Sequence, residues 1–295
     1  MVSLVKLSSS NLDEFKKLYE KNFERATYDK DFFEYYTNQS FIPKILLKRF
    51  VKLFMFNGEY IGYIWYEVPI NIQIKILSLY IDKQYVDIID NSILKKFNDK
   101  YLIYESIESN INNTLLSNLG FKKVKLSKIM NLKLTDYNKK DEIKKIRYNL
   151  YNDINITFEK VDIKNDALLR CDVQNSIFKD IDRVPIDVED IENDFKQDYY
   201  IEDLAIFMKI NNNVVAYGQI IYTRKMFTVV NFGVIDAYRG KSLGKILLDY
   251  LINKAKDKNI SELALGVDEN NFNAISLYNW IGFSEEYNVS RWIRE

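Results

Sequence analysis

The sequence predicts an α/β (α+β) protein of two similar domains, each a mixed, mostly antiparallel sheet flanked by helices. The 295-residue chain is long enough for two ordinary domains, and its hydrophobic fraction of 47% can fill two cores. Strand, hairpin and helix patterns recur in the same order in both halves. The halves also close on similar helix ends, SNLGF and NWIGF, whose glycines Gly120 and Gly282 lie 162 residues apart. A repeat of this length indicates a duplicated domain rather than a solenoid.

The first half has a strand pattern at 4–7, a helical pattern at 11–23 and a second helical region near 31–36. A hairpin is expected over 51–68, because apolar runs flank Asn57-Gly58, the strongest short hairpin signal. The remaining patterns predict a strand, a helix, a strand and a helix, in that order, at 72–81, 86–97, 101–106 and 113–121.

The second half repeats this order. A strand at 154–161 precedes a helix at 166–178 and a second helix that Pro185 opens with an acidic first turn. A hairpin follows, with strands at 204–210 and 214–222 around an Asn-rich turn. The last predicted elements are a strand, a helix, a strand, a helix and a terminal strand, at 227–235, 244–256, 262–267, 273–282 and 290–295.

A polar run at 135–145, whose C-terminal part has helical character, separates the two halves. We therefore expect a first domain at 1–136, a linker at 137–153 and a second domain at 154–295.

Composition limits the possible functions. Lys plus Arg equals Asp plus Glu at 42 each, which argues against a dedicated nucleic-acid binder. The sequence shows no apolar run long enough to span a membrane and no signal-peptide core, so we expect a cytoplasmic protein without a membrane partner. The one cysteine, Cys171, fits a reducing compartment.

The chain has no histidine. This excludes Ser-His-Asp and Cys-His catalysis and a histidine general base, and we expect no metal site. Acid–base chemistry must therefore use carboxylates, tyrosine, lysine or water.

The segment DAYRGKSLGKILL (236–248) places two of only nine glycines, Gly240 and Gly244, in a basic loop that leads into a helix. Backbone N–H groups and the helix dipole at such a point favour phosphate or pyrophosphate. Gly244 lacks a Cβ that would hold a phosphate away. Positive charge comes from Arg239, Lys241 and Lys245. The alternative interpretation is an ordinary turn and cap with solvated lysines.

The surrounding sequence resembles the GNAT (general-control-related N-acetyltransferase) superfamily. The family's acyl-CoA loop, R/Q-x-x-G-x-G/A, is matched by residues 239–244, except that Ser242 stands in place of the first glycine. We expect this serine to weaken binding without abolishing it. A second motif, V-x-x-x-N-x-x-A-x-x-L-Y-x-x-x-G-F, is matched at all seven defined positions: Val267, Asn271, Ala274, Leu277, Tyr278, Gly282 and Phe283. These motifs lie within 154–295, whereas 1–134 shares only the element order and the terminal Gly-Phe.

The resemblance implies two tandem GNAT-like domains and an N-acetyltransferase that uses acetyl-CoA as its acyl donor. The acceptor is expected to be the amine of a small molecule or a peptide. The family pattern assigns coenzyme binding to the strand end, the loop and the later motif: Val234, Ile235, Arg239, Gly240, Lys241, Ser242, Leu243, Gly244, Lys245, Asn271, Ala274 and Tyr278. Within this set the Val234 N–H polarises the thioester carbonyl, and Tyr278 is the acid that protonates the thiolate. Asn271 either binds pantetheine or caps its helix.

The general base is open at this point, with Asp268 favoured over Glu269. Asp268 and Glu269 follow a strand that lines the acceptor channel in the family, and a base reached only through water is an alternative. The acidic stretch at 186–203 could attract a cationic amine, although charge runs are more often solvated faces.

We do not expect the first half to bind the coenzyme, because alignment places Tyr85 at the position of Arg239 and Asp90 at that of Gly244. A carboxylate there would repel a pyrophosphate. Likewise Leu116 replaces Tyr278, and Ser109 replaces Asn271. We therefore expect a degenerate first repeat with a structural or substrate-shaping role.

Two alternatives to an acetyltransferase are a non-catalytic acyl-CoA-binding or regulatory module and a transferase that uses aminoacyl-tRNA.

Overall fold

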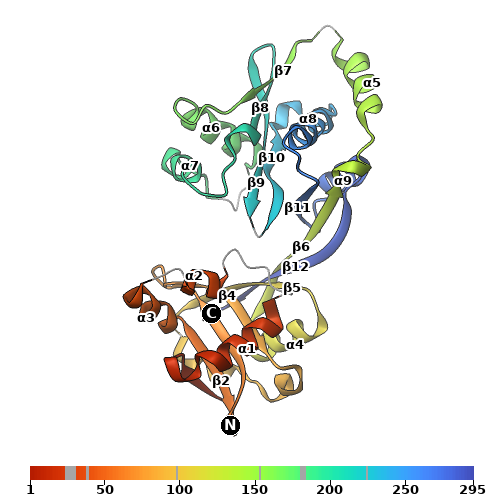
Figure 1. The fold of residues 1–295 in the computed structure, drawn as a ribbon. Helices are drawn as coiled ribbons and strands as arrows, with labels where there is room; N and C mark the ends of the chain where they lie inside the picture. Colours follow the sequence, from red (N-terminus) through yellow and green to blue (C-terminus); the bar gives the residue numbers. More distant parts are fainter. Residues whose placement is uncertain (24–30, 38–39, 98, 153, 180–183, 224) are drawn as a thin grey trace. The chain divides into compact units, whose positions relative to one another are not determined.

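The computed structural model describes residues 1–23, 31–37, 40–97, 99–152, 154–179, 184–223 and 225–295. The chain forms two compact units, drawn in Figure 1. Unit 1 comprises Met1–Lys128 together with Tyr287–Glu295, and unit 2 comprises Ile129–Glu286. These limits differ from the domains expected at 1–136 and 154–295 and from the linker expected at 137–153. The C-terminal strand joins unit 1, and the expected linker contains a helix of unit 2.

Unit 1 has the mixed sheet that the sequence predicts, with strand order β1-β2-β3-β4-β5-β12. The hairpin prediction is confirmed, because Asn57 and Gly58 adopt φ values of +49° and +85°. Helix α3 was not predicted. The helices and strands that come from the first half are β1 (Ser3–Lys6), α1 (Leu12–Phe23), α2 (Phe32–Thr37), α3 (Phe41–Arg49), β2 (Val51–Phe56), β3 (Glu59–Tyr66), β4 (Gln73–Ile81), β5 (Tyr101–Ile107), α4 (Asn110–Asn118) and β6 (Lys122–Lys133).

The helix predicted at 86–97 is wrong. The chain there forms two 3₁₀ helices, η2 (Lys83–Ile88) and η3 (Asn91–Phe97), separated by Ile89 in an extended conformation. Asp90 turns the chain at this break, since its carboxylate accepts a hydrogen bond from the Ser92 N–H at 2.7 Å. Asp and Asn side chains that bond nearby backbone groups compete with helix formation, which explains the interruption.

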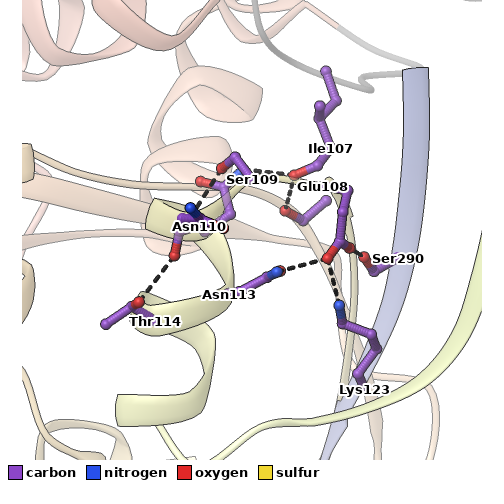
Figure 2. Close-up of polar contacts among 10 residues, drawn as sticks. Ile107, Glu108, Ser109, Asn110, Asn113, Thr114, Lys123 and Ser290 are labelled. Carbon is purple, nitrogen blue, oxygen red and sulfur yellow. Dashed lines mark hydrogen bonds and ion pairs between the residues drawn. The ribbon is translucent and has the colours of Figure 1, made fainter. Parts of the chain in front are cut away.

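The C-terminal strand β12 (Ser284–Arg294) belongs to unit 1 from Tyr287 onward and completes the sheet of that unit. It pairs antiparallel with β5 from Val289 opposite Ile107 to Arg294 opposite Leu102, and Trp292 is buried in the unit 1 core. Figure 2 shows how the side chains follow: the Glu108 carboxylate accepts hydrogen bonds from Lys123, Asn113 and Ser290 of β12. Residues more than 180 positions apart are thus part of one compact unit.

Unit 2 includes, from Ile129 onward, a strand that begins in unit 1, and it includes a helix where a linker was expected. Strand β6, which no sequence pattern predicted, lies beside β11 in the order β6-β11-β10-β9-β8-β7. Helix α5 occupies most of 137–153; its Ile143 is buried, and its Ile146 packs against the unit 2 core. The elements after β6 are α5 (Lys140–Tyr151), β7 (Ile156–Lys160), α6 (Ala167–Ile177), α7 (Val188–Phe195), β8 (Ala205–Ile210), β9 (Asn213–Thr223), β10 (Met226–Val234), α8 (Leu243–Asp257), β11 (Glu262–Asp268) and α9 (Phe272–Ile281).

The sheets are mixed and mostly antiparallel, as predicted: β4 pairs in parallel with β5 and β10 with β11, whereas the neighbouring hairpins are antiparallel. In unit 2, successive side chains of β9 point to opposite faces of the sheet and pack in two different hydrophobic clusters. Ala216 and Ile220 pack with helix α8, and Tyr217 packs with Val173 and Ile177 of α6 on the other face. The sheet is therefore covered on both faces by helices that the sequence predicts.

Candidate active site

Strands β10 and β11 separate in the middle of the unit 2 sheet. They pair at Thr228 opposite Ala264 and at Val229 opposite Leu265. Asn231 then has a φ of +50° and the β10–β9 register shifts, which marks a β-bulge. Beyond these two pairs, the described part of both strands shows no further pairing, although β10 continues to Val234 and β11 to Asp268. The bulge thus leaves one edge of β10 open.

The end of β10 directs alternate backbone groups to opposite sides. The Ile235 N–H donates to the Val215 carbonyl at 2.9 Å, so this N–H is used within the sheet. Because backbone groups of successive strand residues alternate, the Val234 N–H points away from β9, toward the gap beside β11. This is where the resemblance places the donor to a thioester carbonyl.

The loop at residues 239–244, called the glycine loop below, presents a row of backbone donors at the start of α8. Gly240 and Ser242 adopt left-handed φ values of +75° and +60°, and the helix begins at the next residue. The Lys245 and Ile246 N–H groups both donate to the Ser242 carbonyl. Within the part of the chain that the structure describes, the N–H groups of residues 240–244 have no backbone acceptor. Such unsatisfied donors at a helix N-terminus form an anion site.

The two loop glycines serve different purposes. A Cβ on Gly240 would meet no atom within 4 Å, so its backbone conformation explains the residue. A Cβ on Gly244 would lie 3.2 Å from Leu277 Cδ2 and 3.9 Å from atoms of Phe232 and Val234. It would point into an apolar wall of the domain. Close packing of α8 against α9 and β10 is therefore the reason that the structure gives for Gly244, in place of the expected clearance for a phosphate.

The cationic side chains of the loop are engaged by the domain. Arg239 Nε donates to the Val234 carbonyl at 2.9 Å, and its guanidinium also bonds the Ile177 carbonyl and pairs with Asp236. Lys241 Nζ donates to the Ala237 carbonyl at 3.2 Å. These contacts show a loop that holds its own shape, with Arg239 tying it to the end of β10.

Lys245 lies over the ring of Trp280, with its Nζ 4.0 Å from the ring centroid. A cation–π contact of this kind keeps the ammonium beside the first turn of α8. Leu243, the first residue of α8, is buried in the unit 2 core.

Tyr278 is buried on α9, with its ring 6.2 Å from that of Phe232 and 6.0 Å from that of Phe283. Burial raises the pKa of its phenol to about 12. The hydroxyl is therefore protonated throughout the physiological range, as a hydrogen-bond or proton donor must be.

Asn271 caps helix α9. Its Oδ1 accepts a hydrogen bond from the Ala274 N–H at 3.1 Å, which is the helix-start role weighed in the sequence analysis. This contact also accounts for the Asn-x-x-Ala spacing, since the cap reaches the third residue beyond it.

The two candidate bases differ in their surroundings. Asp268 ends β11, and its Oδ1 accepts a hydrogen bond from the Asn270 N–H at 2.9 Å, so it shapes the turn before α9. Glu269 is half-buried next to it. The Asp268 carboxylate is thus engaged within its own turn.

The acidic stretch at 186–203 is largely occupied by structural contacts. Asp187 and Asp190 form a capping box at α7, and Asp203 pairs with Lys160 and Lys258. These residues therefore serve the local structure, as in the interpretation of the charge run as a solvated face.

One polar cluster beneath the bulge was missed in the sequence. Arg170 of α6 is only 1% exposed, pairs with Asp194 at 2.5 Å, and lies against the rings of Phe195, Tyr200 and Tyr217. The buried Gln219 Oε1 accepts hydrogen bonds from three donors, Arg170, Tyr217 and the bulge residue Asn231. An arginine within a helical pattern gave no signal that it would be buried.

The described residues contain no group of three His, Cys, Asp or Glu side chains placed to hold a metal ion. No helix in the described ranges is long and apolar enough to cross a bilayer.

Residues 175–283, which contain the bulge, the loop and the α9 motif, match the family model of the acetyltransferase (GNAT) family. This part of the chain is a GNAT acetyltransferase domain. The match makes the chain an acyltransferase of a family that uses acyl-CoA. No curated protein matches the sequence significantly.

Solved structures extend the fold likeness over the whole chain. A GCN5-related N-acetyltransferase from Sphaerobacter thermophilus is 12% identical, with a TM-score of 0.67 over 100% of this chain and 95% of that one. A GNAT-family acetyltransferase from Colwellia psychrerythraea is 15% identical, with a TM-score of 0.56 over 100% of both chains. A tandem GNAT protein from the clavulanic acid biosynthesis pathway is 11% identical, with a TM-score of 0.56 over 100% of this chain and 98% of that one. At such identities the likeness shows a shared fold, here of tandem GNAT type.

Unit 1 has a GNAT-like order of elements but a different structure at the counterpart of the coenzyme loop. The two 3₁₀ helices η2 and η3 take the place that α8 has in unit 2. Asp90 lines a small cavity there of about 230 Å³. Leu116, at the position of Tyr278, is buried in the core, whereas Ser109 caps α4 as Asn271 caps α9.

Proposed function

We propose that the GNAT domain of unit 2 transfers an acetyl group from acetyl-CoA to a primary amine by direct attack. One observation carries this proposal: the N–H groups of residues 240–244 lack backbone acceptors and stand at the N-terminus of α8, directly after a strand whose edge is open. A pyrophosphate would satisfy these donors. An extended pantetheine beside β10 would take the place of the missing strand pairing.

The residues present fit such a donor. The Val234 N–H faces the gap between β10 and β11, where it would stabilise charge on the thioester oxygen. The space beside Gly240 is open. Arg239 donates a hydrogen bond to the Val234 carbonyl and so holds the end of β10 in place. Coenzyme binding is thus assigned to backbone groups of the loop, while Arg239 acts as a positioning residue.

In the proposed reaction the amine nitrogen attacks the acetyl carbon, a C–N bond forms and the C–S bond breaks. The departing sulfur takes a proton from the Tyr278 hydroxyl, whose pKa of about 12 keeps it protonated until charge develops on sulfur. The amine gives its proton to Glu269 or Asp268, directly or through water. Asp268 Oδ1 already accepts the Asn270 N–H within the turn before α9, so we favour Glu269 over Asp268, the base that the sequence favoured.

We further propose that unit 1 binds no coenzyme. Two short 3₁₀ segments offer neither the aligned dipole nor the row of donors that α8 offers, and Asp90 would repel a pyrophosphate. Unit 1 would then have a structural or substrate-shaping role.

The proposal is tested by following thiol release from acetyl-CoA with a panel of amines that includes diamines, amino sugars and peptides. Acceptor-dependent release that falls in Glu269→Gln more than in Asp268→Asn supports both the reaction and the choice of base. Coenzyme binding without acceptor-dependent release across the panel would instead favour the non-catalytic binding module.

A further inference from the structure

Helix α5, which the sequence presented as a linker, is fastened to α8 and to the glycine loop by two tyrosine hydroxyls. Tyr137, just before α5, donates to Asp249 Oδ1 of α8 at 2.6 Å. Tyr151, the last residue of α5, donates to the Lys241 carbonyl at 2.6 Å. Between them, α5 packs along α8. The C-terminal end of α5 therefore reaches the loop itself.

We infer that the Tyr151 hydroxyl is a positioning residue that sets the orientation of the Lys241–Ser242 peptide for coenzyme binding. This inference rests on the proposed function of the loop. A trans peptide points its carbonyl and its N–H in opposite directions. By holding the Lys241 carbonyl, Tyr151 directs the Ser242 N–H away from α5, as one of the row of donors at residues 240–244.

The conformation of Ser242 shows why the loop needs such a contact. Ser242 has a φ of +60° and a ψ of +8°, a left-handed conformation that disfavours residues with a Cβ. Its side chain makes no capping hydrogen bond that would offset this. The loop pattern of the GNAT family has glycine at this position. A serine in the left-handed conformation is strained, and a flip of the Lys241–Ser242 peptide would relieve this strain. The bond from Tyr151 opposes that change.

Tyr151 is suited to this role by its chemistry. Burial raises the pKa of its phenol, so the hydroxyl remains a donor. The Lys241 carbonyl is a backbone group, and the contact therefore acts on the peptide plane whatever the Lys241 side chain does.

The test compares three variants: Tyr151→Phe, Tyr137→Phe and Tyr151→Phe combined with Ser242→Gly. Tyr137→Phe is the matched control, because it removes the other hydroxyl of the same attachment from a bond to α8 and leaves the loop untouched. The readouts are the Kd for coenzyme A by calorimetry, kcat and KM for acetyl-CoA, and the HN–Hα coupling of Ser242 without ligand.

We expect Tyr151→Phe to raise Kd and KM about fivefold, the effect of one lost hydrogen bond, with kcat nearly unchanged. Tyr137→Phe should leave Kd unchanged, and Ser242→Gly should restore most of the loss because glycine adopts the loop conformation freely. Equal effects of both tyrosine variants, no effect of Tyr151→Phe, or no restoration by Ser242→Gly would overturn the inference.

Failure of the proposed function gives a different result. If the unaltered protein binds no coenzyme A, the loop proposal fails, but the Ser242 coupling still shows whether Tyr151 holds the peptide. A coupling unchanged in Tyr151→Phe would overturn the positioning role by itself.

Discussion

Leu277 of α9 closes the space beside Gly244 of α8: a Cβ at residue 244 would lie 3.2 Å from Leu277 Cδ2. The two residues belong to the two motifs that resemble the GNAT family, and the structure joins them in one wall with Phe232 and Val234. The loop motif and the α9 motif are thus coupled by packing.

This contact predicts a graded effect at residue 244. Gly244→Ala should weaken coenzyme A binding by about tenfold or less, because the flexible end of Leu277 can shift to admit a methyl group. Gly244→Asp should abolish measurable binding, because it carries a negative charge into the apolar wall of Leu277, Phe232 and Val234 at the start of α8, where the helix would have to shift. Calorimetry on both variants checks this order. Equal binding by Gly244→Asp and Gly244→Ala would refute the role of charge.

Tyr278→Phe should lower kcat by about 10- to 100-fold while KM for acetyl-CoA changes little. The hydroxyl is required as charge develops on the sulfur, whereas the buried ring contributes packing that phenylalanine retains. Steady-state kinetics with the best amine of the panel measures the effect, and a thermal melt confirms that the variant is folded. A kcat equal to that of the unaltered enzyme would remove Tyr278 from the mechanism.

Tyr278 also predicts how stability depends on pH. Its folded pKa of about 12 is raised above the value of about 10 in an unfolded chain. The stabilising contribution is therefore fully present below about pH 10 and is lost as pH rises toward 12. The free energy of urea unfolding should fall between pH 9 and 11, each about one unit from the unfolded pKa. It should fall less in Tyr278→Phe. An identical fall in both proteins would contradict the raised pKa.

Deleting residues 287–295 tests the division into units. Unit 1 would lose a strand paired with β5 along six positions, together with the core residue Trp292, and should unfold or become sensitive to protease. Removal of Glu295 alone is the control, since it lies beyond the end of β12. If the deletion destabilised residues 154–286 and spared 1–128, the boundary expected from the sequence would hold instead.

Local signals in the sequence predicted most of the elements and the principal motifs. Asn57-Gly58 indicated a hairpin because the turn is determined by two residues, and the Asn-x-x-Ala spacing at 271–274 indicated a helix start for the same reason. The loop glycines were recognised too, although the packing that explains Gly244 depends on Leu277, which is remote in sequence.

What the sequence did not predict depends on contacts between distant segments. Strand β12 pairs with β5, which lies far from it in the sequence, and the residue pattern of β12 does not identify this partner. The helix expected at 86–97 was interrupted by a local bond from Ser92 to Asp90 that competed with an apolar spacing. Tyr151 was one of 22 tyrosines, and only its contact with Lys241 distinguishes it.

The central claim is that unit 2 alone binds the coenzyme through the glycine loop. Titration of the full chain with acetyl-CoA by calorimetry tests it most directly, with Gly244→Asp as the control. The account predicts one site per chain in the unaltered protein and none in the variant. Two sites, or a single site that persists in Gly244→Asp, would contradict it.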